Sequence, residues 1–232
     1  MAGTQPNDDR QAPAHSPISQ VAVTMLRARM TSTFAATYLT LLSIIQGTTT
    51  ALLFSKVDAL IGRGDFHLPQ LVLTIGLFWI IVLLWHQYQI GVILYEWVPQ
   101  FFDAVVPFVL GACEFAAILG LQYGSLVTAV TFTVFFLLGL LGLEYQFFQV
   151  TRATTRPGIG SVVRGFRTWD LIVNGVSVLI FAVTAALLWR YPPPGGQSLW
   201  ANAMVLVVAL LHGTRQIAEW RLVQVRAHEP AA

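Results

Sequence analysis

Six stretches of about 20 mainly apolar residues dominate this sequence and restrict it to one class of fold. They lie near residues 34–54, 70–94, 101–121, 125–148, 170–189 and 199–219. Charged residues make up 10% of the chain, against about 25% in soluble domains. So few ionised side chains cannot cover a water-exposed surface. Because about 20 apolar residues form one membrane-crossing helix, we predict an all-α, polytopic integral membrane protein with six transmembrane helices.

The remaining segments are short. Residues 1–30 form an N-terminal arm, partly disordered because residues 1–17 are polar and contain proline. Residues 18–30 are either an interfacial helix, with Arg27 and Arg29 near lipid phosphates, or an ordinary polar lead-in. No signal peptide is expected, because the first 30 residues contain no apolar core. Residues 31–221 then form a single transmembrane domain, followed by a short tail at 222–232.

The basic residues predict the orientation. Ten of the 13 lysines and arginines fall on one side of a six-helix topology, in three groups: Arg10, Arg27 and Arg29; Arg152, Arg156, Arg164 and Arg167; and Arg215, Arg221 and Arg226. Lys56, Arg63 and Arg190 fall on the other side. Since basic loops stay in the cytoplasm, we expect both termini to be cytoplasmic. The predicted location is the plasma membrane, which is the inner membrane in a bacterium.

The sequence carries no pattern that is typical of an enzyme. It has no Gly-rich phosphate loop, no HExxH and no nucleophile motif. Cys113 is the single cysteine, which excludes a disulfide framework and a CxxC metal site. The arginines follow the topology and form no nucleic-acid face. We therefore expect neither catalysis nor a metal, a cofactor or a nucleic-acid partner.

Polar residues gather in the cytoplasmic half of the predicted helices. The positions are His86, Gln89, Asp103, Glu144, Asp170, Asn174, His212, Arg215 and Glu219, with Glu114 near the middle of its helix. Ionisable groups within a span usually face a cavity or a partner, because each costs about 2.5–3.5 kcal/mol at the helix centre. These positions predict a polar cavity open to the cytoplasm. Glu114 is singled out, since its depth penalises its charge and suits a proton or cation site.

A second set of polar positions lies on the first helix. Thr40, Ser43, Gln46, Gly47 and Thr50 form a stripe of small or polar side chains on one broad face. The stripe indicates either the lining of an ion path or close helix packing.

A structural interpretation of the polar residues stands beside the functional one. Polar groups near helix ends reach the headgroup zone at small cost. Trp85, Tyr88, Tyr95 and Trp97 are typical of an interfacial aromatic belt. Arg215 and Glu219, spaced i, i+4, are typical of a structural ion pair.

The order of features in the first three helices resembles the endolysosomal-type potassium channels, in their short prokaryotic six-helix members. The matching stretches are 43-SIIQGTTTALLF-54, 83-LLWHQYQ-89 and the FFDAVVPF that opens the third helix, with Gly47, Trp85, His86 and Asp103 at matching positions. Ile44, Ile45 and Gln46 replace the F-S-D of the family's R-x-x-x-F-S-D motif, whose arginine is also missing. The resemblance implies a tetramer whose first helix lines a pore. The chain also resembles uncharacterised bacterial six-helix membrane proteins.

Three functions follow from these features. The first is an oligomeric pathway for potassium ions or protons, with the first helix near the pore. The second is a non-catalytic scaffold or accessory subunit that binds a membrane-protein partner. The third is a haem-binding electron-transfer protein that uses His86 and His212, which lie on different helices at similar predicted depth. For all three functions we expect the helices to lie in, and contact, a lipid bilayer.

Overall fold

The chain folds into a bundle of long helices. The computed structural model describes residues 17–94, 101–153 and 159–228, with the backbone alone described near several helix ends. The helices are α1 (Pro17–Gly62), α2 (Leu68–Leu94), α3 (Phe101–Tyr123), α4 (Ser125–Ala153), α5 (Ile159–Arg190) and α6 (Leu199–His228). All six are long and apolar enough to cross a membrane. No strand occurs in the described residues, so the predicted all-α class with six such helices is confirmed.

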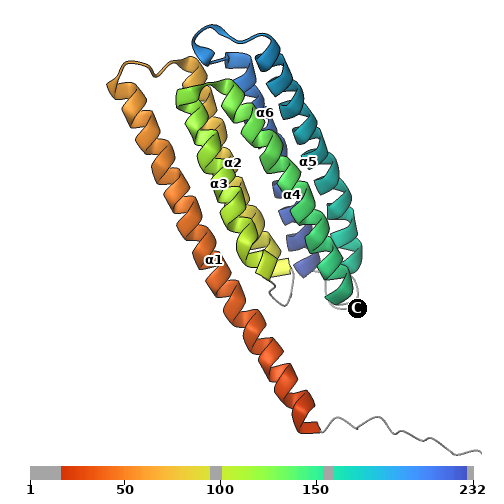
Figure 1. The fold of residues 1–232 in the computed structure, drawn as a ribbon. Helices are drawn as coiled ribbons and strands as arrows, with labels where there is room; N and C mark the ends of the chain where they lie inside the picture. Colours follow the sequence, from red (N-terminus) through yellow and green to blue (C-terminus); the bar gives the residue numbers. More distant parts are fainter. Residues whose placement is uncertain (1–16, 95–100, 154–158, 229–232) are drawn as a thin grey trace, which may run out of the picture.

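The helices run alternately up and down, as Figure 1 shows. The first described residue and the end of α6 therefore lie at the same end of the bundle, which we call the terminal end. The opposite, distal end carries the connections that follow α1, α3 and α5. The last of these contains a single 3-10 turn, Pro194–Gly196, because its prolines and glycines break the helix.

Helix α1 extends far beyond its expected bounds. Its 46 residues correspond to about 69 Å at 1.5 Å per residue, and its membrane-length part is Ala36–Gly62. Residues 18–30, expected to form a separate interfacial helix or a lead-in, continue α1 in a straight line past the bundle (Figure 1). The expected start of the span, near 34, agrees with Ala36, whereas the helix itself begins earlier because helix formation depends on the backbone. No glycine or proline interrupts residues 18–46.

A single residue connects α3 to α4. Gly124 has a φ of +107°, a conformation that L side chains rarely adopt. A Cβ atom at Gly124 would lie 2.6 Å from the carbonyl oxygen of Gly196, so the turn also packs against the α5–α6 connection. Glycine here is required both by the backbone conformation and by the close approach.

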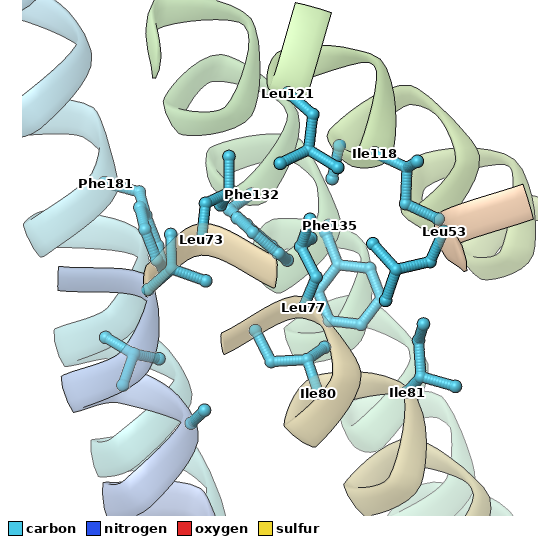
Figure 2. Packing of buried hydrophobic residues seen from close by; sticks show 14 of the residues in the cluster. Leu53, Leu73, Leu77, Ile80, Ile81, Ile118, Leu121, Phe132, Phe135 and Phe181 are labelled. Carbon is cyan, nitrogen blue, oxygen red and sulfur yellow. The ribbon is translucent and has the colours of Figure 1, made fainter. Parts of the chain in front are cut away.

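The core joins all six helices. Phe132, Phe136 and Phe181 stack at its centre, with ring centroids 5.1 to 6.0 Å apart. Aliphatic side chains from α1, α2 and α3 belong to the same core, and Figure 2 shows them together with Phe132 and Phe181. The extensive contacts of α1 are with α2 and α3, which places α1 at the edge of the bundle.

Candidate functional site

Three charged side chains meet inside the bundle, in the part of α5 and α6 nearer the terminal end. The guanidinium of Arg215 on α6 forms an ion pair with the carboxylate of Asp170 on α5. Its Nε lies 3.3 Å from Oε1 of Glu219, one turn further along α6. The side chains of Arg215, Asp170 and Glu219 are only 6%, 9% and 12% exposed. We call this trio the α5–α6 charge site.

The charge site contains one more acidic than basic group. Within the described residues, both carboxylates pair with the same cation, Arg215. Arg167, one turn before Asp170 on α5, instead binds Glu144 on α4 through two hydrogen bonds of 2.7 and 3.3 Å. An excess negative charge is costly away from water. A bound proton or small cation would therefore balance the site.

Polar contacts continue from the charge site toward the core. His212, one turn before Arg215, has its Nε2 3.1 Å from the hydroxyl oxygen of Ser177. That hydroxyl donates to the carbonyl of Val173 at 2.7 Å, so it accepts the Nε2–H of His212. Asn174, between Asp170 and Ser177 on the buried face of α5, donates to the Asp170 carbonyl at 2.8 Å.

The polar contacts that run from the charge site through His212 end at the aromatic core. The His212 ring stacks on Phe136 with centroids 5.1 Å apart, and Phe136 in turn stacks on Phe181. A further group of buried polar side chains lies near the distal end and includes Asn202 and Gln197. The packed phenylalanines lie between this distal group and the polar residues around His212.

The distal polar region was not predicted. Asn202 is fully buried and donates to the carbonyl of Pro69 at 2.9 Å. Gln197 donates to the carbonyls of Gly120 and Leu121 at 2.9 and 3.0 Å. These bonds hold the α5–α6 connection against α3 and the start of α6 against α2. Asn202 within an apolar run could have indicated a buried polar contact. Its partner on α2 is the backbone carbonyl of Pro69, which a sequence pattern does not reveal.

His86 belongs to a contact between α2 and α6. Its Nδ1 lies 3.0 Å from Oε1 of Gln216. The amide nitrogen of Gln216 donates to the carbonyl of Leu83 at 3.1 Å, so its oxygen faces His86 and accepts the Nδ1–H. Gln89, which was grouped with His86, is half-buried on the same helix.

The two histidines therefore have different partners and do not form a common site in the described structure. His86 binds Gln216, whereas His212 binds Ser177. No group of three or more metal-ligating side chains occurs in the described residues. The separate partners of His86 and His212 do not support the hypothesis that the two histidines bind one haem.

Glu114 lies apart from the charge site, on α3 facing α1. It is 2% exposed, and its Oε2 accepts a hydrogen bond of 3.1 Å from Nε2 of Gln46, which is 6% exposed. Glu144 is also separate, because it lies at the surface with Arg167. The side chain of Asp103 lies outside those that the structure describes. The expected polar positions thus divide into several local groups.

The stripe on α1 divides in a similar way. Gln46 points into the bundle, Thr50 is half-buried, and Thr40, Ser43 and Gly47 are exposed. The hydroxyls of Thr40 and Ser43 donate to their own helix, at the carbonyls of Ala36 and Leu39. The indole of Trp85 on α2 also donates to Ser43 at 3.3 Å.

No protein-family model, curated protein or solved structure matches this chain. The functional argument therefore depends on the geometry of the charge site and its neighbours.

Proposed function

We propose that the protein is an integral membrane protein that binds a proton or a small monovalent cation at the α5–α6 charge site and forms part of a pathway for it. The observation that carries this proposal is the buried trio of two carboxylates and one guanidinium. Such a site reaches charge balance by taking up one positive charge. Groups of this kind within membrane helices mark ion or proton pathways.

The proposed orientation makes the charge site accessible from the cytoplasm. The basic residues favour cytoplasmic termini, and Asp170 and Glu219 lie nearer the terminal end of their helices. An ion from the cytoplasm would then meet Glu219 and Asp170 first and His212 next. The Phe136 and Phe181 rings would close the pathway beyond His212 in this conformation.

This proposal keeps the predicted cation or proton pathway and assigns it to different helices. The α1 stripe supports a pathway less well, because Gln46 and the exposed Thr40 point in different directions. The hydroxyls of Thr40 and Ser43 also bind their own backbone. The charge site has the buried, uncompensated charge that α1 lacks.

Ion flux from liposomes tests the proposal. Purified protein should release K⁺ or protons faster than protein-free liposomes over a range of imposed voltages. Asp170→Asn and Glu219→Gln should reduce that flux strongly, because each removes a carboxylate of the site without changing its size. Glu144→Gln is the matched control, since Glu144 is an exposed carboxylate near the same end of the bundle. Wild-type protein that releases neither ion at any voltage would exclude the proposal.

A scaffold or accessory subunit is the second candidate, and the position of α1 favours it. The outer face of α1 is exposed along its membrane-length part, where small residues such as Thr40, Gly47 and Ala51 lie beside the exposed side chains of Ile44 and Phe54. Small residues allow close helix contacts within membranes. A second copy of the chain or another membrane protein could pack there. Co-purification of a partner at a fixed ratio, with no ion flux, would favour this function.

A further inference from the structure

The contact between α1 and α3 contains a second buried polar site, independent of the charge site. Gln46 and Glu114 lie in the membrane-length parts of α1 and α3, with Glu114 near the middle of Val105–Tyr123. The two helices approach closely nearby. A Cβ atom added to Gly111 would lie 2.6 Å from Cγ2 of Ile45. Movement of either side chain toward water would therefore require the helices to separate.

Two oxygen atoms of this pair have no hydrogen-bond donor among the described residues. Nε2 of Gln46 donates to Oε2 of Glu114, but Oε1 of Gln46 and Oε1 of Glu114 are buried without a partner. Thr49, the nearest hydroxyl along α1 on the buried face, donates to the carbonyl of Ile45 at 2.9 Å. Buried polar atoms are nearly always hydrogen-bonded, so the pair lacks one donor.

The surrounding titratable groups do not supply the missing positive charge. On α3 the neighbour is the half-buried thiol of Cys113. Lys56 on α1 contacts Gln122 near the distal end, at 3.5 Å. His86 on α2 binds Gln216 of α6, and Glu144 on α4 binds Arg167. Within the described residues, Glu114 therefore has no cationic partner.

A proton fits this site better than a metal cation. Hard metal cations take about six or more oxygen ligands, whereas two oxygens lack partners here. A carboxylic acid and an amide, in contrast, form two reciprocal hydrogen bonds. A proton on Oε1 of Glu114 would be donated to Oε1 of Gln46 and would satisfy both atoms. It would also remove a full negative charge from the interior.

We propose that Glu114 is a proton-binding site within the membrane, holding a proton that it shares with Gln46 and that fastens α1 to α3. Proton release would leave a carboxylate facing the amide oxygen of Gln46 and would weaken the contact between the two helices. The site would thus link proton binding to the position of α1. It does not depend on the function proposed for the charge site, because it involves different helices.

Infrared spectroscopy of the purified protein tests this proposal at neutral pH. The spectrum should contain the C=O stretch of a protonated carboxylic acid that shifts in D₂O and is lost in Glu114→Gln. Gln46→Leu should retain the band and move it to higher frequency, because the acid loses its hydrogen-bond partner. Glu144→Gln, which removes an exposed carboxylate, should leave the band unchanged.

Two results would overturn the proposal. In the first, Glu114→Gln loses only ionised carboxylate absorption, which would show that Glu114 carries no proton. In the second, Gln46→Leu leaves the band at its original frequency, which would show that the proton is not shared with Gln46. Helix content and a single size-exclusion peak should be checked for each variant. The isosteric Glu114→Gln can itself donate to Gln46, so it should retain the fold.

Discussion

At the scale of single residues, Arg215 holds the charge site together. Its guanidinium contacts carboxylates on two helices, and its side chain is 6% exposed. Removing one partner of a buried ion pair is strongly destabilising, because the other charge stays buried without compensation. The stability of the α5–α6 contact should therefore depend on Arg215 more than on any exposed arginine.

Substitution of Arg215 tests this dependence. Arg215→Leu should lower the free energy of unfolding in detergent by about 3–5 kcal/mol, because Asp170 and Glu219 would remain buried without a cation. Arg167→Gln, which breaks the exposed pair with Glu144, should cost no more than about 1 kcal/mol. Thermal or denaturant unfolding of both variants gives the comparison. Equal losses of stability in the two variants would contradict the burial of Arg215 between Asp170 and Glu219.

At the scale of helices, the conformation of the turns determines how the helices are connected. Helices α3 and α4 run antiparallel with only Gly124 between Tyr123 and Ser125. This connection is possible because glycine adopts a positive φ and because no side chain separates it from Gly196. A substitution at this turn should therefore affect both α3–α4 and the α5–α6 connection.

Gly124→Ala should lower the free energy of unfolding by about 1–3 kcal/mol, the usual cost of an unfavourable backbone conformation. The contact of 2.6 Å with Gly196 would add to this loss. Gly175→Ala is the matched control, because Gly175 lies inside α5 and has no atom within 4 Å of its added Cβ. That control should be neutral or stabilising by up to about 1 kcal/mol. If Gly124→Ala unfolds like wild type, position 124 does not require the positive φ that only glycine adopts easily.

At the scale of the whole molecule, the outer surface of the bundle is strongly apolar. Large exposed side chains include Trp79 on α2, Leu141 on α4, and Leu179 and Trp189 on α5. Such a surface is stable in lipid and would aggregate in water. The exposed face of α1 carries small residues at Thr40, Gly47 and Ala51 beside the large side chains of Ile44 and Phe54. Small residues such as Gly47 are positions at which another helix can approach α1 closely.

Disulfide cross-linking tests whether copies of the chain associate through α1. In a Cys113→Ala background, Gly47→Cys should form a covalent dimer in membranes under mild oxidation, because position 47 is exposed and unobstructed. Leu179→Cys, on the exposed face of α5, should remain monomeric. Similar cross-linking at both positions would indicate random collision, and no dimer at position 47 would contradict a homo-oligomer built on α1.

Hydropathy was sufficient to predict the number and approximate position of the helices. The transfer of each apolar residue into lipid contributes separately to membrane insertion, so a hydropathy pattern locates a span without knowledge of its neighbours. The expected segment 101–121, for example, agrees closely with α3, Phe101–Tyr123. The helix ends were less accurate, because polar residues can continue a helix beyond the apolar run. Helix α1 begins early through a stretch without proline or glycine, and α5 begins early even though its first turns contain Gly160 and Gly165.

The i, i+4 spacing correctly predicted the ion pair of Arg215 with Glu219, but contacts between polar residues of different helices became visible only in the folded chain. Sequence reasoning assigned a depth to His86, Glu144, Asp170 and His212, and equal depth predicted one shared cavity. Depth does not determine which way a helix is rotated or which helix packs beside it. Asp170 meets Arg215 because α5 and α6 turn these faces toward each other, whereas Glu144 faces Arg167 at the surface and Glu114 faces Gln46 on α1. These pairings depend on side chains far apart in the chain packing together, which local sequence patterns do not encode.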